Sequence, residues 1–206
     1  MTAGLRKVDK SQMTHKNPAL RTTSVVTESA PRSAASGSAP TAAQSKRPSK
    51  KELDGNKWAI ENYDNEKTPI EIDAQRQHSI LITRCNSTTI RVSGKANAIS
   101  VDNCSRLDII VDSLVSSVSV VGSNNFRIQV TGTLPSVQLD KVDGATIYLS
   151  PESLDAEIYT SKCSSINITL PPANDNADSV EAPIPEQIRS WVVNGKLQSE
   201  IVKQEG

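Results

Sequence analysis

Pairs of aliphatic residues separated by one other residue recur between residues 70 and 149 at steps of nine or ten positions. In a β-strand, residues two apart point to the same face, so each pair predicts a short strand with one buried face. Val and Ile dominate the pairs, as is typical of strands. The pairs are Ile70/Ile72, Ile80/Ile82, Ile90/Val92, Ile99/Val101, Ile109/Val111, Val118/Val120, Ile128/Val130, Val137/Leu139 and Ile147/Leu149.

Two successive steps add up to a repeat of about 19 residues, with about six repeats between residues 56 and 170. A period of this length with two strands per repeat is typical of a parallel β-helix, with the polar runs between pairs as its corners. The leucine-rich-repeat signature is missing. Three columns share the register: Ile80, Ile99, Val118, Val137 and Ile158; Ile90, Ile109, Ile128, Ile147 and Ile168; and Cys85, Cys104, Ser123, Val142 and Cys163.

The C-terminal part of the chain predicts a different element. Residues 171–187 contain four prolines, and we expect the coils to stop there. In residues 188–206, Asn194-Gly195 separates two alternating apolar runs, which predicts a hairpin with a type I′ turn. A lone hairpin is marginally stable, so we expect it to lie either on its own helix end or on that of a second subunit. Exchange of the hairpin between two subunits would form a homodimer at low cost. The predicted interface is Ile188, Trp191, Val192, Val193, Asn194, Gly195, Leu197 and Ile201.

Charge divides the chain into an arm and a body. The first 51 residues carry ten basic and two acidic side chains, whereas the remaining 155 carry 13 basic and 21 acidic ones. Residues 22–55 are rich in Ser, Ala, Thr, Pro and Lys and lack apolar periodicity, which predicts a flexible linker. Residues 1–21 combine isolated apolar and basic residues, as short binding segments do. The folded domain is therefore expected at residues 56–206, preceded by a disordered basic arm.

Composition narrows the possible functions. Six aromatic residues argue against a stacking surface for nucleic acid, and a basic run such as KRPSKK is more typical of a solvated tether. No apolar run is long enough to span a membrane, and the first residues lack the apolar core of a secretory signal. Three cysteines without close spacing suit a reducing compartment, so we expect a cytoplasmic protein.

Candidate chemical groups have structural interpretations. The shared column indicates that Cys85, Cys104 and Cys163 are core thiols rather than metal ligands, although Cys85 and Cys104 are close enough to be bridged. His15 and His78 are expected to face solvent. Three carboxylates suit corner hydrogen bonds better than a hydrolase site: Asp102, Asp140 and Asp143. The sequence therefore predicts no catalytic residue, metal or cofactor, and a protein that is not an enzyme.

Several segments together resemble the C-terminal region of the cyclase-associated protein (CAP) family. THKNPALR at 14–21 is similar to the family's verprolin-homology stretch, and GLRKV at 4–8 to its LKKV-type core. KWAIENY at 57–63, KANAISVDNC at 95–104, KVDGATIYLS at 141–150, PIPEQ at 183–187 and WVVNGKL at 191–197 resemble its C-terminal domain.

The resemblance implies a right-handed parallel β-helix that dimerises by exchanging C-terminal strands. It implies binding to ADP-loaded actin monomers, faster replacement of ADP by ATP, and work alongside cofilin and the adenylyl cyclase pathway at the actin cytoskeleton. The residues carried over as actin contacts are Leu5, Arg6, Lys7 and Val8 in the arm and Lys95, Asn97, Ser100, Asp102, Asn103, Arg106, Lys141, Asp143 and Lys162 in the body, with Lys203 to Gly206 at the tail.

Two other functions are compatible with a β-helix. A related fold occurs in tubulin-folding cofactors that activate small GTPases with an arginine finger, and Arg76 or Arg84 would be that finger here. A polysaccharide-active β-helix is less consistent with the scarcity of aromatic residues.

Overall fold

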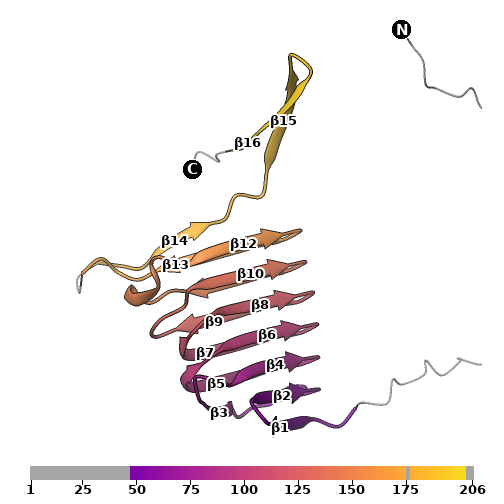
Figure 1. Cartoon of the computed structure of the whole chain (residues 1–206), viewed down its shortest axis with the longest axis vertical. Helices are drawn as coiled ribbons and strands as arrows, with labels where there is room; N and C mark the ends of the chain where they lie inside the picture. Colours follow the sequence, from indigo (N-terminus) through magenta and orange to yellow (C-terminus); the bar gives the residue numbers. More distant parts are fainter. Residues whose placement is uncertain (1–46, 175–176, 203–206) are drawn as a thin grey trace, which may run out of the picture. The chain divides into compact units, whose positions relative to one another are not determined.

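The structure, a computed structural model, describes residues 47–174 and 177–202. Two seven-stranded sheets stack their strands in parallel layers (Figure 1). In spatial order, the first sheet contains β1 (Lys50–Asp54), β2 (Lys57–Glu61), β4 (Ser79–Thr83), β6 (Ala98–Asp102), β8 (Ser117–Val121), β10 (Ser136–Asp140) and β12 (Glu157–Ser161). The second contains β14 (Val180–Pro183), β13 (Ser164–Leu170), β11 (Asp143–Tyr148), β9 (Asn124–Val130), β7 (Ser105–Leu114), β5 (Asn86–Ala96) and β3 (Ile70–Ala74).

The chain alternates between the two sheets, so each strand of the first sheet and the next strand of the second form one coil. From β2/β3 to β12/β13 this gives six coils, which confirms the predicted all-β parallel helix. Ile90 pairs with Ile109, and Ile109 with Ile128, directly above one another. The 19-residue repeat is therefore the physical length of a coil.

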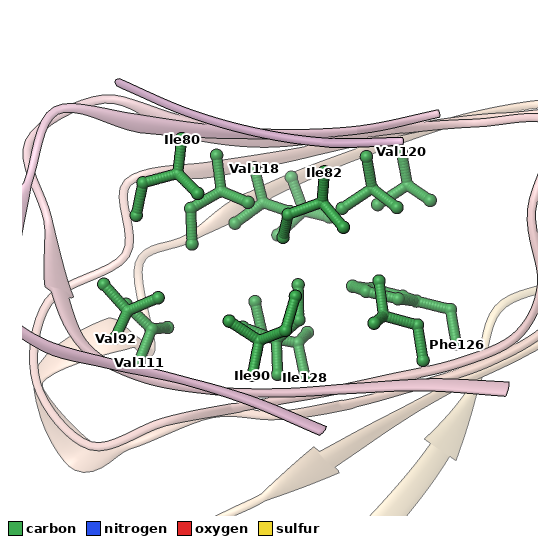
Figure 2. Packing of buried hydrophobic residues seen from close by; sticks show 14 of the residues in the cluster. Ile80, Ile82, Ile90, Val92, Val111, Val118, Val120, Phe126 and Ile128 are labelled. Carbon is green, nitrogen blue, oxygen red and sulfur yellow. The ribbon is translucent and has the colours of Figure 1, made fainter. Parts of the chain in front are cut away.

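The inward side chains of both sheets fill the space between them (Figure 2). Ile82, Ile90, Val118 and Ile128 are fully buried, and Phe126 is 1% exposed. Each such side chain contributes about 1.5–3 kcal/mol on removal from water, most of which offsets the ordering of the backbone.

Left-handed backbone conformations build the corner that leads from the first sheet to the second, here called the first corner. Each coil contributes two of them, three residues apart. Peptide N–H groups there donate to the next coil, as from Arg84 to the Asp102 carbonyl (3.1 Å) and from Lys141 to the Ser161 carbonyl (2.9 Å). The residues with positive φ are Asn62, Arg84, Asn103, Gly122, Lys141 and Lys162 in one column and Asn65, Ser87, Arg106, Asn125, Gly144 and Ser165 in the other.

Antiparallel strands from the flanking segments close one sheet at each end of the helix. At the N-terminal end β1 pairs with β2, and at the C-terminal end β14 pairs with β13. The prediction of a linker through residue 55 was wrong at its C-terminal end, because strand pairing begins at Lys50. The coils do stop within residues 171–187, where β14 turns back along the last coil.

The last two strands, β15 (Ile188–Val193) and β16 (Lys196–Ile201), form a sheet of their own. Asn194 and Gly195 have φ of 51° and 75°, the positive values at both central positions that a type I′ turn requires. The predicted hairpin is therefore confirmed. The structure also contains a short 3-10 helix at Pro151–Ser153, which the sequence did not predict.

Candidate interaction surfaces

The first corner gathers most of the body residues that the sequence predicted as contacts. It holds Asp102 at the end of β6 and five exposed residues that follow strands of the first sheet or begin strands of the second. In the first five coils, the left-handed peptide that follows the strand of the first sheet donates to the next coil, so the corner presents its side chains from a rigid backbone. The five exposed residues are Asn103, Arg106, Lys141, Asp143 and Lys162.

Side chains at this corner also link successive coils. Arg106 donates from Nε to the Ser87 hydroxyl (2.7 Å) and from Nη2 to Asn86 Oδ1 (3.0 Å). The Ser164 hydroxyl donates to Asp143 Oδ1 (2.7 Å). The corner is thus a column of charged and amide groups that crosses the coils.

Lys95 and Asn97 lie elsewhere, at the corner that returns from the second sheet to the first, here called the second corner. Both are half-buried: the Lys95 ammonium donates to the Thr133 hydroxyl (3.3 Å), and the Asn97 N–H donates to the His78 carbonyl (2.8 Å). The whole of β6 separates Asn97 from Asn103, about 17 Å of extended chain. The structure therefore does not bring all the predicted residues together.

The outer face of the first sheet lies between the two corners, and its middle column carries uncharged side chains. Ser100 stands there in register with Leu81 and Ser119, and the column continues to Gln138 and Tyr159. Such a column offers a partner few charged contacts.

The outer face of the second sheet carries an ion pair that the sequence analysis missed. Arg127 donates from Nε and Nη2 to the two carboxylate oxygens of Asp108, both at 2.7 Å. These hydrogen bonds raise the pKa of Arg127 above its ordinary value. The two residues are one coil apart, so their spacing of 19 was a signal available in the sequence. Hollows of about 530 and 400 Å³ border this pair.

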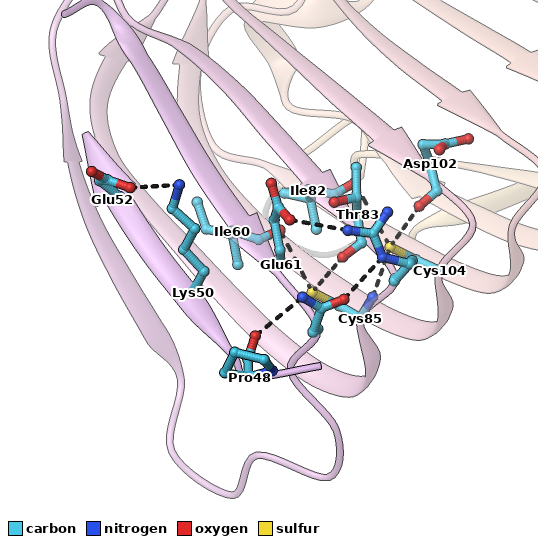
Figure 3. Close-up of polar contacts among 12 residues, drawn as sticks. Pro48, Lys50, Glu52, Ile60, Glu61, Ile82, Thr83, Cys85, Asp102 and Cys104 are labelled. Atoms are coloured by element: carbon cyan, nitrogen blue, oxygen red, sulfur yellow. Dashed lines mark hydrogen bonds and ion pairs between the residues drawn. The ribbon is translucent and has the colours of Figure 1, made fainter. Parts of the chain in front are cut away.

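Two thiols meet inside the first corner (Figure 3). Cys85 and Cys104 are 1% and 2% exposed, and the Cys85 N–H donates to the Cys104 sulfur at 3.4 Å. The Cys104 thiol donates to the Asp102 carbonyl (3.4 Å). Interaction between the two neighbouring thiol side chains lowers the pKa of Cys85 and raises that of Cys104. Both are core thiols as predicted, whereas Cys163, in the last coil, is half-exposed.

The prediction that His78 faces solvent was wrong. The side chain is 6% exposed, its Nδ1 accepts the Gln75 N–H (3.1 Å), and its ring lies edge-on to Trp58 at 6.4 Å. His78 stands two residues before Ile80, on the same inward side of the chain. Within the described residues, no group of three His, Cys, Asp or Glu side chains is arranged to hold a metal ion.

The hairpin has one apolar face. Cross-strand pairing places Ile188 beside Ile201 and Val192 beside Leu197, and these four side chains are 60–72% exposed. Trp191 and Val193 lie on the opposite face, where the Arg189 guanidinium stacks 5.3 Å from the indole. Of the predicted interface, four residues thus form an apolar surface, two face away from it, and two form the turn.

Glu186 connects the last coil to the hairpin. Its carboxylate accepts the N–H of Ser165, the left-handed residue of that coil, at 2.5 Å. At the base of the hairpin, the Val202 N–H donates to the Gln187 carbonyl (2.9 Å). A hollow of about 850 Å³ lies between this segment and β13.

Taken together, these features define a parallel β-helix with a polar first corner and a separate C-terminal hairpin. The family model described as "Adenylate cyclase associated (CAP) C terminal" matches residues 47–204. The chain belongs to the adenylyl cyclase-associated protein family.

Comparisons with individual proteins agree with this assignment. The chain is 40% identical over 207 residues to the adenylyl cyclase-associated protein of Schizosaccharomyces pombe, which covers 100% of this chain and 37% of that protein. It is 38% identical over 200 residues to the adenylyl cyclase-associated protein of Dictyostelium discoideum, and the match covers 97% of this chain and 41% of that protein. The crystal structure of cyclase-associated protein from Cryptosporidium parvum superposes with a TM-score of 0.71 at 30% identity, covering 76% of this chain and 96% of that chain.

The family assignment and the fold bear on the alternative functions. The chain spans about two-fifths of the length of these curated relatives. A GTPase-activating role is not favoured, and the Arg84 guanidinium donates to Glu61 Oε2 (3.0 Å) and Asn62 Oδ1 (2.9 Å). In the described part of the chain, no helix is both long and apolar enough to cross a membrane. The predicted contacts Leu5 to Val8 and Lys203 to Gly206, and His15, lie outside the described residues.

Proposed function

We propose that this chain binds actin monomers, promotes exchange of their ADP for ATP, and so returns monomers to filament growth. The observation that carries the proposal is the family match over the whole β-helix, together with the arm segment that resembles an actin-binding core. Partnership with cofilin-bound actin, a link to the adenylyl cyclase pathway and a cytoplasmic location belong to the same proposal.

Exchange of this kind needs no catalytic residue. If the protein binds the actin conformer with a loosened nucleotide cleft more tightly than the closed one, it shifts actin toward the loosened conformer. Acceleration is then limited by the difference between the two affinities. A rigid surface suits this task because it does not adapt equally well to both conformers.

The first corner is the surface we propose for the principal contact. Its backbone is fixed by hydrogen bonds between coils, and its exposed side chains include an amide, three basic groups and one carboxylate. Rim charges of this type contribute orientation and association rate more than affinity. Ser100 on the adjoining sheet face extends this surface, whereas Lys95 and Asn97 lie across the sheet from it.

The apolar hairpin face supports a homodimer. Four aliphatic side chains at 60–72% exposure form a patch of the kind that marks an interaction site. In the first sheet β12 pairs only with β10 among the described strands, so its outer edge offers hydrogen bonds to an incoming strand. We infer that each subunit places its hairpin on the other, as the sequence analysis expected.

The test is release of a fluorescent ADP analogue from G-actin at substoichiometric protein. The wild type is expected to accelerate release. Lys141→Ala/Lys162→Ala at the first corner is expected to reduce the effect about tenfold, since contacts at a hot spot contribute that much. Lys95→Ala/Asn97→Ala at the second corner is the matched comparison and is expected to change it little. A folded dimer that leaves ADP release unchanged contradicts the proposed function.

A further inference from the structure

Two thiols lie against each other inside the first corner, and the proposed contact surface uses neither of them. Asn86 of β5 pairs with Ser105 of β7, and Cys85 and Cys104 immediately precede these partners on adjacent coils. The Cys85 N–H donates to the Cys104 sulfur at 3.4 Å, and both side chains are buried (Figure 3). The structure thus places the two thiols one coil apart at the same inward position.

The backbone at this position suits a disulfide. Neighbouring strands lie about 4.8 Å apart, and disulfides join Cα atoms that are about 4.4–6.8 Å apart. Because Asn86 and Ser105 are in register, the residues just before them have the spacing of neighbouring strands. The bond can therefore form by rotation of the two side chains, without a change in the stacking of the coils.

The next coil shows what the same position does without sulfur. Ser123 follows Cys104 in this column, and its hydroxyl accepts the Cys104 N–H at 3.1 Å. Cys104 accepts the Cys85 N–H in the same way, although sulfur is a weak acceptor. The structural task of this position is thus met by a hydroxyl, and the property that a pair of thiols adds is reversible oxidation.

The two thiols differ in reactivity. The neighbouring Cys104 side chain lowers the pKa of Cys85, and the Arg84 guanidinium acts in the same direction against the effect of burial. The pKa of Cys104 is raised, first by its interaction with Cys85 and then by burial. Cys85 is therefore the sulfur suited to meet an oxidant as a thiolate, and Cys104 the one suited to react afterwards as a thiol.

We propose that Cys85 and Cys104 form a reversible disulfide when the protein meets hydrogen peroxide. The Cys85 thiolate attacks one peroxide oxygen, the O–O bond breaks, hydroxide leaves, and Cys85 becomes a sulfenic acid. The Cys104 thiol then attacks the Cys85 sulfur, so that the S–S bond forms, the S–O bond breaks, and the hydroxyl leaves with the thiol proton as water. The two sulfurs lose two electrons in all, and peroxide takes them up. Peroxide is neutral and little larger than water, which suits it to a buried thiol.

The disulfide connects the coil of β5 to the coil of β7 beneath the left-handed residues Arg84 and Asn103. It closes a loop between residues 19 positions apart and stabilises the fold by restricting the unfolded chain. Oxidation is therefore expected to raise the melting temperature, and a dithiol reductant is expected to restore it. Bonds of this transient kind are the ones that occur in reducing compartments.

Peptide mapping of the full chain after peroxide treatment tests the proposal, with free thiols alkylated before digestion. Trypsin cleaves after lysine and arginine, so Cys85 lies in peptide 85–91 and Cys104 in peptide 96–106. In the wild type the two peptides are expected as a linked pair, lighter than their sum by two hydrogen atoms and separated again by dithiothreitol. The melting temperature is expected to rise by roughly 5–10 °C on oxidation.

Two serine variants separate this disulfide from other oxidation. Cys104→Ser keeps a hydrogen-bond acceptor, as Ser123 does one coil later, and is expected to form no linked pair and to show no rise in melting temperature. Cys163→Ser removes the half-exposed thiol of the last coil and is expected to behave like the wild type.

Peroxide that oxidises Cys163 in the wild type but leaves peptides 85–91 and 96–106 unlinked would overturn the proposal. An equal rise in the melting temperature of Cys104→Ser would also contradict it. If Cys104→Ser does not fold, the linked pair in the wild type and in Cys163→Ser still decides the question. Because neither measurement involves actin, the result is independent of the proposed function.

Discussion

The two ends of the β-helix are protected in different ways. At the N-terminal end, β1 closes one sheet, and the edge of the other carries a lysine on its carbonyl and carboxylates on its face. Beyond the C-terminal end, the hairpin leaves four aliphatic side chains 60–72% exposed. Charge on an edge opposes pairing with other molecules, whereas an exposed apolar face favours it. The same fold thus has one end whose charges oppose association and one segment whose exposed apolar face favours it.

The coils between the two ends have a buried interior, and their stability is the standard against which changes at either end are compared. Val137 lies in the fifth coil, pairs with Val118 and Ile158 on either side, and is fully buried. Val137→Asp is expected to unfold the body, because an unpaired carboxylate in this stack costs a large part of a total stability of about 5–15 kcal/mol. Circular dichroism during thermal unfolding measures it. Gln138→Asp, one residue away on the exposed face, is the control and is expected to remain folded.

A folded Val137→Asp protein with an unchanged melting temperature would contradict the inward assignment of this column. The interior of the coils would then tolerate a buried charge and would not differ from the two ends in this respect.

The hairpin is expected to give the next largest effect, on association rather than folding. Val192→Asp/Leu197→Asp places two charges on its apolar face and is expected to weaken the proposed dimer at least about 100-fold, since each lost aliphatic contact contributes about 1.5–3 kcal/mol. Light scattering across a concentration series measures the mass. Gln198→Asp, on the opposite face beside Trp191, is the control. A double variant that stays dimeric would show that the exposed face is not the interface.

The repeat and the hairpin were predictable because their signals are local or periodic. Ile90 and Ile109 stack because a 19-residue coil returns the chain to the same place, and Asn194-Gly195 specifies its own turn. The first strand was not predictable from hydrophobic pattern, because all five residues of β1 are exposed and only pairing with β2 makes them a strand.

The corners show a second limit on what the sequence can predict. A left-handed conformation costs an isolated non-glycine residue about 1–2 kcal/mol, so Arg84 and Lys141 are poor candidates for it by composition. Hydrogen bonds to the next coil impose that conformation all the same. Asn97 and Asn103 are close in sequence yet lie at opposite corners, whereas Asp108 and Arg127 are distant in sequence and in contact. On a β-helix, residues at matching positions of neighbouring coils form a common surface. Family motifs list residues that are close in sequence, so they do not show which coils bring residues together.

The N-terminal edge is expected to give the smallest effect. Lys51→Ala removes the hydrogen bond to the Glu71 carbonyl and the contact with Trp58, and is expected to lower the free energy of unfolding by about 0.5–1.5 kcal/mol. Denaturant titration measures the change, with the exposed Lys57→Ala as control. If the two variants are equally stable, Lys51 contributes nothing measurable to stability at this end. A loss well above that range would mean that one side chain holds the first coil in place, and the N-terminal end would then depend on a specific contact as much as the hairpin does.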